Sequence, residues 1–314
     1  MNMSKIHLSM FANAFSFKLP AEEAKKWVWS EKMAECVLEF GYDSVELSVK
    51  RHINVDEILS GKAGEVNRIA EKYGLEITAL ASHANHLHED LEKRKEINNQ
   101  FKKTIEASSL LDVPVIVTLS GIPVPFTYFY PYPESNIDEL EKAWKEFKEV
   151  WLPLVDYAAT HGVKIAIEAH YGQLVYNTQT IKRMFQEINS RFLGLNLDPS
   201  HFAWQFIDVL VIVEKFGDKI YHLHAKDIEV NEVKLKENGI LATGKWSSEE
   251  RSWKFRVPGR GIINWKRLLE TLIIDKGYRG AVSFEHEDIV AGLEEGAKEA
   301  YHFLRNILAD LGVY

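Results

Sequence analysis

The feature that most constrains this chain is a repeated alternation between short runs of Val, Ile and Leu and longer segments of helical period, often joined at Gly or Pro. This pattern is typical of βα units, so we expect parallel strands connected by helices. Eight units in 314 residues predict an α/β fold, a single (β/α)₈ TIM barrel over residues 1–314. The strands are predicted at Ile6–Met10, Ser44–Leu47, Glu76–Ala81, Pro114–Leu119, Lys164–Ala169, Leu193–Leu197, Ile220–Ala225 and Ala281–Glu285.

The segments between the strands contain helical patterns and two exceptions. Gly121–Asn136 is rich in Pro and aromatic residues and is predicted to be a long loop. Residues 228–261, after the seventh strand, are too long for an ordinary βα loop and are predicted to form a lid or a partner-binding insertion. The helices are predicted at Ala21–Phe40, Asp56–Tyr73, Glu89–Leu111, Asp138–His161, Thr178–Asn189, Phe206–Phe216, Trp265–Lys276 and Leu293–Leu311. A doubly wound sheet is the alternative fold, but the glycine-rich phosphate-binding motifs typical of it are missing from the sequence.

Composition and charge exclude several classes of function. The formal net charge of −8 argues against a general affinity for nucleic acid, because a phosphate-binding surface normally has a basic excess. The sequence contains neither a signal-peptide pattern nor a run of 18 apolar residues. With the single cysteine Cys36, no intramolecular disulfide can form. We therefore expect a cytoplasmic protein that does not bind membranes.

Four predicted strands end in an ionisable residue: Glu168, Asp198, His224 and Glu285. The carboxyl ends of all barrel strands open on one face, so these side chains are expected to converge. Three carboxylates placed together would repel each other unless a cation lay between them. Carboxylate oxygens with a single imidazole suit Mn²⁺, Mg²⁺ or Co²⁺ better than structural Zn²⁺. The sequence therefore predicts one divalent-metal site.

Neighbouring polar residues extend this predicted site. His222 precedes His224 by two positions and is expected to support it, while Lys226 is expected either to stabilise a developing enolate or to pair with Asp227. Histidines are concentrated at the same strand ends, which is typical of proton transfer and hydrogen bonding to a substrate. They are His83, His86, His88, His170, His201, His222, His224 and His286.

These motifs together resemble the xylose isomerase-like TIM-barrel superfamily, in particular its sugar phosphate isomerase/epimerase branch. The motifs are Glu168-x-His170, Asp198-Pro199-Ser200-His201, the His-x-His-x-Lys-Asp run 222–227 and Glu285-His286-Glu287-Asp288. The resemblance implies one metal, commonly Mn²⁺, held by Glu168, Asp198, His224 and Glu285. It also implies that Glu168 and Glu285 are the catalytic residues that move a substrate proton. The candidate substrate-binding residues are His201, His170, Lys226, His83, Trp204 and Arg256.

The sequence departs from two patterns of that superfamily. Simple ketose 3-epimerases carry an acidic residue where this chain has Leu174, and the metal-ligand pairs of the endonuclease branch are missing. By contrast, residues 177–180, 201–208 and 251–261 look like the subgroup that contains the catalytic subunits of C-glycoside deglycosidases.

Three hypotheses for function follow from these residues. The first is a metal-dependent carbohydrate isomerase or epimerase that abstracts a proton next to a carbonyl. The second is a metal-dependent lyase that cleaves 3-oxo-glycosides by β-elimination, and the third is a non-catalytic sugar-binding subunit. The expected partners are a small carbohydrate or glycoside substrate and either further copies of the chain or a small β-rich subunit.

Overall fold

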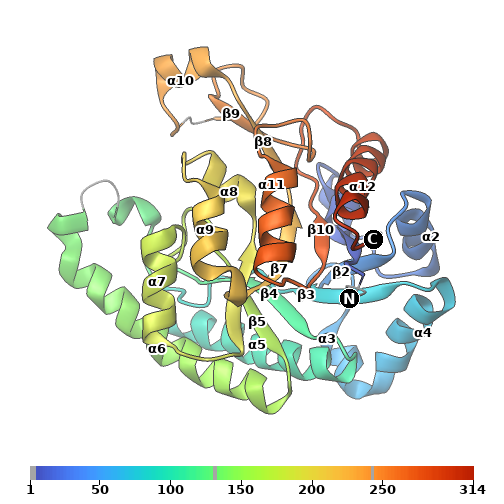
Figure 1. Cartoon of the computed structure of the whole chain (residues 1–314). Coiled ribbons are helices and arrows are strands. Elements are labelled where there is room, and N and C mark those ends of the chain that lie inside the picture. Colours follow the sequence, from blue (N-terminus) through green and yellow to red (C-terminus); the bar gives the residue numbers. More distant parts are fainter. Residues whose placement is uncertain (1–4, 130–132, 242–243) are drawn as a thin grey trace.

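The predicted barrel is present, and its eight parallel strands close in the order β1-β10-β7-β6-β5-β4-β3-β2. The structure is a computed structural model that describes residues 5–129, 133–241 and 244–314 (Figure 1). The barrel strands are β1 (Leu8–Phe11), β2 (Ser44–Ser48), β3 (Glu76–Ala81), β4 (Val115–Leu119), β5 (Lys164–Glu168), β6 (Leu193–Leu197), β7 (Ile220–Ala225) and β10 (Val282–Phe284). Three strands, β3, β6 and β7, have the predicted bounds.

The strands read as continuous apolar runs because they are covered on both faces. In β4, for example, the sequence VIVTL is buried from Val115 to Thr118. Helices on the outside of the barrel cover one face, and side chains packed inside the barrel cover the other (Figure 1). The register of β5 pairs Glu168 with Leu119 of β4 and Asn196 of β6, which places Glu168 at the carboxyl end of the barrel.

The helices follow the predicted positions with two corrections. Residues 21–40, predicted to be one helix, form α1 and α2 instead, because Ser30 caps a new helix by accepting a hydrogen bond from the Met33 amide. The predicted helix 56–73 is interrupted at Gly61, whose φ of 109° is not helical. The α-helices are α1 (Ala21–Ala24), α2 (Glu31–Glu39), α3 (Val55–Glu57), α4 (Ala63–Tyr73), α5 (Leu91–Leu110), α6 (Ile137–Thr160), α7 (Thr178–Glu187), α8 (Pro199–Ala203), α9 (Val209–Phe216), α10 (Glu232–Asn238), α11 (Trp265–Leu269) and α12 (Leu293–Asp310).

The insertion after β7 is an ordered hairpin. Strands β8 (Asp227–Val230) and β9 (Trp253–Arg256) pair antiparallel, and α10 lies between them in the sequence. The three elements project together above the end of β7 at the top of Figure 1. Within the described part of the chain, no helix combines the length and apolar character needed to cross a membrane.

Asp227 connects this hairpin to the barrel. Its carboxylate accepts hydrogen bonds from the amides of Ile228, Gly259 and Ile263 and from the Trp265 indole, at 2.8–3.1 Å. A side chain at Gly261 would collide with this carboxylate, because a Cβ there would lie 2.1 Å from Asp227 Oδ1. Asp227 therefore bonds to the C-terminal end of the insertion and not to its neighbour Lys226, whose side chain is directed at the carboxylates of the barrel.

We expect the substitution Asp227→Ala to lower the free energy of unfolding by about 3 kcal/mol, because it leaves several buried N–H groups without an acceptor. Urea denaturation followed by circular dichroism measures this. The control is Asp310→Ala at the exposed end of α12, which should be nearly neutral. Equal stability of the two variants would show that Asp227 does not anchor the insertion.

Candidate metal and substrate site

The four predicted metal ligands lie at the carboxyl ends of successive strands. Glu168 ends β5, His224 is near the end of β7, and Glu285 directly follows β10. Asp198 follows β6 and caps α8, because its Oδ1 accepts hydrogen bonds from the Ser200 amide and hydroxyl. Parallel strands thus bring together residues that are up to 117 positions apart in the sequence, from 168 to 285.

These four side chains lie close together, and three of them are fully buried. Glu168, Asp198 and His224 each offer a ligand atom, and the three atoms lie within 4.8 Å of one another. His224 Nδ1 is 3.3 Å from Glu168 Oε2 and 3.2 Å from Glu285 Oε2. The exposed fraction is 3% or less for Glu168, Asp198 and His224. All four predicted ligands therefore meet around one point.

One buried atom in this cluster supports a cation site. Among the described residues, His224 Nδ1 has no hydrogen-bond partner, whereas Asp198 Oδ2 forms ion pairs with Lys226 Nζ at 3.0 Å and His201 Nε2 at 3.3 Å. Buried polar atoms are normally satisfied, so an unpaired nitrogen facing carboxylate oxygens indicates a missing positive ligand. The donor set of carboxylates and one imidazole is the kind that divalent ions prefer. The residues present therefore fit the metal that the sequence predicts.

Lys226 supplies a positive charge to the same carboxylates. Its ammonium group donates hydrogen bonds to Glu285 and Glu287, both at 2.8 Å, and lies 3.0 Å from Asp198 Oδ2. The side chain is fully buried, which is rare for lysine unless it is paired. Of the two roles considered for Lys226, pairing with Asp227 is not what the structure shows.

Protonation in the cluster follows from these contacts. Burial alone would raise the pKa of Glu168, but hydrogen bonds from His201 and His83 and the nearby charge of His224 outweigh it and hold that pKa well below its usual range. Burial lowers the pKa of His224, yet the carboxylates of Glu46 and Glu285 raise it well above the ordinary value. A proton and a divalent ion therefore compete for His224 Nδ1.

Sequence reasoning missed one residue of the site, Glu46 on β2. Its fully buried carboxylate lies 2.9 Å from His222 Nε2 and 3.1 Å from His224 Nε2, and it accepts a hydrogen bond of 2.8 Å from the Ser283 hydroxyl. An ionised carboxylate only accepts hydrogen bonds, so both Nε2 atoms must carry protons. In neutral His224 this leaves Nδ1 without a proton and free to bind a metal. The only sequence signal was an acidic residue between Val45 and Leu47 in an apolar strand.

Three predicted substrate-binding residues surround Glu168. His201 Nε2 lies 3.1 Å from Glu168 Oε1, and His83 Nε2 lies 3.3 Å from Glu168 Oε2. The ring of His170 packs edge-on against that of His201, with 4.1 Å between the centroids. Burial lowers the pKa of His170 to about 3, so this histidine is neutral at physiological pH.

The two remaining predicted substrate-binding residues lie farther out. Trp204 stacks on Trp253 of β9, with 4.9 Å between the ring centroids. Arg256 pairs with Glu229 within the insertion and, at 3.0 Å, with Asp288 in the loop after β10. The second ion pair joins the insertion to that loop. Within the aromatic loop predicted at Gly121–Asn136, residues 130–132 lie outside the described part of the chain.

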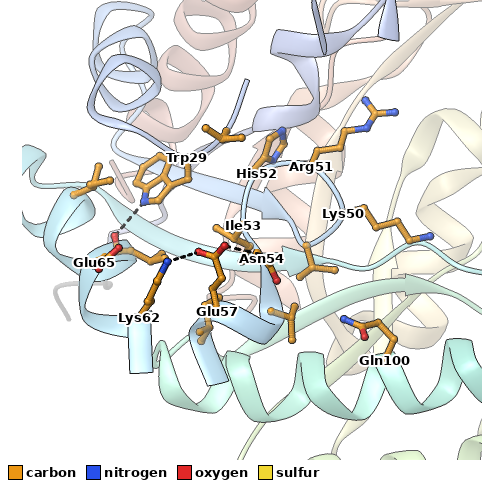
Figure 2. A pocket seen from close by; sticks show the side chains of 16 residues that line it. Trp29, Lys50, Arg51, His52, Ile53, Asn54, Glu57, Lys62, Glu65 and Gln100 are labelled. Atoms are coloured by element: carbon orange, nitrogen blue, oxygen red, sulfur yellow. Dashed lines mark hydrogen bonds and ion pairs between the residues drawn. The ribbon is translucent and has the colours of Figure 1, made fainter. Parts of the chain in front are cut away.

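A separate groove of about 520 Å³ lies beside the loop between β2 and α3 (Figure 2). The sixteen side chains drawn in Figure 2 include none of the ten predicted site residues. Lys50 and Arg51 at its edge bond elsewhere, to the His83 carbonyl and the Ser16 hydroxyl. The groove is therefore distinct from the metal cluster.

A closed parallel barrel with carboxylates and histidines at its carboxyl end defines a class of metal-site barrels. Comparison with known proteins places the chain within it: residues 35–307 match the profile of the xylose isomerase-like TIM barrel, and the chain belongs to that family.

The most similar curated relatives include proteins of known and unknown activity. The uncharacterized protein YfiH of Bacillus subtilis is 31% identical over 299 residues, which cover 89% of this chain and 95% of YfiH. An inosose dehydratase of Mesomycoplasma hyopneumoniae is 25% identical over 251 residues, which cover 77% of this chain and 79% of that protein. The inosose dehydratase of Geobacillus thermodenitrificans is 28% identical, but the match covers only 52% of this chain and 55% of that protein.

Solved structures share the fold at lower identity. The 3-keto-D-glucoside 4-epimerase YcjR of E. coli has a TM-score of 0.69 and 16% identity, covering 96% of this chain and 100% of that one. The D-psicose 3-epimerase of Clostridium cellulolyticum H10 has a TM-score of 0.68 and 17% identity, covering 96% and 99%. The IOLI protein, whose structure contains a bound zinc atom, has a TM-score of 0.67 and 22% identity, covering 98% of both chains.

We expect Glu46→Gln to weaken Mn²⁺ binding about 10- to 100-fold, because it removes the carboxylate that holds the proton on His224 Nε2. Calorimetric titration of the metal-depleted protein measures the dissociation constant. Glu76→Gln, at the exposed start of β3, is the matched control. If Glu46→Gln bound Mn²⁺ within twofold of the unmodified protein, the supporting role of Glu46 would be refuted.

Proposed function

We propose that this chain is a divalent-metal-dependent carbohydrate isomerase or epimerase that works by proton abstraction next to a carbonyl. The observation that carries the proposal is the placement of two carboxylates, Glu168 on β5 and Glu285 after β10, against the same nitrogen of His224. Two carboxylates that share one site from different strands can act as a base and an acid on one substrate carbon.

We propose Glu168, Asp198, His224 and Glu285 as ligands of one divalent ion, Mn²⁺ first and Mg²⁺ or Co²⁺ as alternatives. When bound, such an ion polarises a carbonyl and hydroxyl pair and thereby acidifies the adjacent C–H. The zinc atom in the structure of the IOLI protein, which shares this fold, supports metal binding without identifying the native ion.

The other residues of the cluster orient these groups. His201, His83 and the Asn196 amide, which donates at 3.0 Å, hold both oxygens of Glu168 in place. Such support from rigid strands keeps a catalytic carboxylate in one geometry. Lys226 would stabilise negative charge that develops on a substrate oxygen.

The second candidate is elimination instead of isomerisation. The curated relatives named inosose dehydratases support it, because a dehydratase expels a hydroxyl group after the same kind of proton abstraction. The motif around residues 251–261 supports a 3-oxo-glycoside as substrate, as in C-glycoside deglycosidase catalytic subunits. In that case the insertion would contact a small β-rich subunit, whereas the first candidate fits a homo-oligomer. A non-catalytic sugar-binding role is the least favoured.

Solvent exchange tests the first candidate. We expect the Mn²⁺-loaded protein to incorporate deuterium from D₂O into a keto sugar, seen by mass spectrometry as a gain of one mass unit. Glu168→Gln and Glu285→Gln should each slow this incorporation about 10²- to 10⁴-fold, because each removes a proton-transfer group. Glu270→Gln, on the surface near α11, is the control.

The products distinguish the remaining candidates. An isomer of equal mass supports the isomerase, whereas loss of water or release of an aglycone supports the lyase. If no keto sugar exchanged a proton in the presence of Mn²⁺, the proposal of proton abstraction would fail.

A further inference from the structure

Two buried nitrogen donors near the insertion have no acceptor. Among the described residues, Arg251 Nε and Trp204 Nε1 are both without a hydrogen-bond partner. Their side chains are nearly inaccessible, with exposed fractions of 7% for Arg251 and 5% for Trp204. Two unsatisfied donors in one region are costly, because each has lost its water without gaining a partner.

The two donors belong to one aromatic cluster. The Arg251 guanidinium lies over the ring of Trp246, 3.9 Å from its centroid, and 5.1 Å from the centroid of Trp253. Trp204 stacks on the same Trp253, and Tyr171 meets Trp204 edge-on with 5.1 Å between centroids. We call Arg251, Trp204, Trp246, Trp253 and Tyr171 the aromatic subsite.

Arg251 differs from the other arginines of the insertion. Arg256 pairs with Asp288 and Glu229, and Arg260 pairs with Glu295 and Glu299. Arg251 forms no ion pair within the described part of the chain. Stacking on indole rings offsets only part of the cost of burying a guanidinium, so its natural complement is an anion supplied from outside the chain.

The aromatic subsite borders the metal cluster. The Phe255 ring joins the two, because it lies 4.6 Å from Lys226 Nζ and 5.3 Å from both the Trp246 and Trp253 ring centroids. The boundary between the aromatic subsite and the metal cluster is open to solvent, since 38% of Trp246 and 38% of the Glu287 side chain are exposed. A group bound here would therefore be part of the same substrate whose other end meets Lys226.

We propose that the aromatic subsite binds a carboxylate carried by the substrate, so that the substrate is a keto-sugar acid. This inference rests on the proposed function and narrows its substrate class. Arg251 supplies a forked pair of N–H donors and one unmatched positive charge, and Trp204 supplies a neutral N–H donor. A carboxylate matches this set in charge and in planar shape.

Charge balance favours a carboxylate over a phosphate. Lys226 is already paired with Asp198, Glu285 and Glu287. Arg251 is the one cation among the five residues of the aromatic subsite, and it has no carboxylate partner among the described residues. A phosphate monoester carries a charge of about −1.5 to −2 at pH 7 and would leave negative charge uncompensated. The charges of Glu287 and Arg251 both influence the pKa of Tyr171, which places the Glu287 carboxylate near the subsite. The second negative charge of a phosphate would therefore lie near that carboxylate.

Direct binding tests the proposal without relying on turnover. The probes are D-glucuronate, D-glucose and D-glucose 6-phosphate, titrated calorimetrically into the Mn²⁺-loaded full-length protein. We expect glucuronate to bind at least tenfold more tightly than glucose or glucose 6-phosphate. Arg251→Gln should weaken glucuronate binding about 10- to 100-fold and leave glucose binding unchanged, because only the acid uses the guanidinium.

Two further variants separate recognition from folding. Trp204→Phe keeps an aromatic ring but removes the N–H donor, and it should weaken glucuronate binding several-fold. Arg260→Gln is the control for loss of an arginine in the insertion and should bind all three probes normally. Melting temperature and Mn²⁺ content should be nearly unchanged in Arg251→Gln, because Arg251 forms no ion pair with any of the described residues.

The outcomes separate this inference from the proposed function. Equal binding of glucuronate and glucose, tightest binding of glucose 6-phosphate, or an equal effect of Arg251→Gln on all probes would each overturn the carboxylate assignment. None of these results affects proton abstraction, which the exchange experiment tests separately. Conversely, tight glucuronate binding that depends on Arg251 would stand even if no proton exchange occurred, and would then define an acid-binding barrel.

Discussion

The structure depends on one electrostatic constraint: buried carboxylates that meet at the carboxyl end of the barrel must be matched by positive charge. Glu168 and Glu285 lie against His224 Nδ1, and Asp198 and Glu285 lie against the ammonium group of Lys226. In a region from which water is excluded, such charges are tolerated only when they are paired or bind a metal. The same requirement explains why His224 Nδ1, which faces the carboxylates of Glu168 and Glu285, has no hydrogen-bond partner among the described residues.

Support for this cluster comes from the opposite side of the barrel. Glu46 reaches from β2 to His222 and His224 on β7 and thereby fixes which nitrogen of His224 faces the carboxylates. Because both strands are held in a closed hydrogen-bonded barrel, the geometry does not depend on a flexible loop. The chemistry therefore rests on the rigid part of the fold, and the parts that vary among such barrels lie around it.

The insertion after β7 adds a second group of contacts beside the carboxylate cluster. Asp227 anchors the insertion to the barrel through hydrogen bonds. The Phe255 ring of the insertion contacts the Lys226 ammonium group, and the Arg251 guanidinium stacks on the Trp246 indole. A barrel that binds a metal at its centre and a charged group at its rim can select a substrate by two separated contacts. Under the proposed function, the carboxylates on the strands would determine the reaction type, and the hairpin above them would determine the choice of substrate.

Sequence alone was sufficient to predict the barrel and the residues that end its strands, because both follow from local periodicity and from the rule that parallel strands open on one face. Glu168, Asp198, His224 and Glu285 could be named for that reason. Glu46, Arg251 and Asp227 could not be assigned their roles, because a lone acidic residue in a strand or a basic residue in a loop looks the same whether it is exposed or buried. The tertiary structure decided those roles, since only closure of the barrel brings Glu46 on β2 within reach of the histidines on β7. Only the folded hairpin shows which arginine has carboxylate partners and which has none among the described residues.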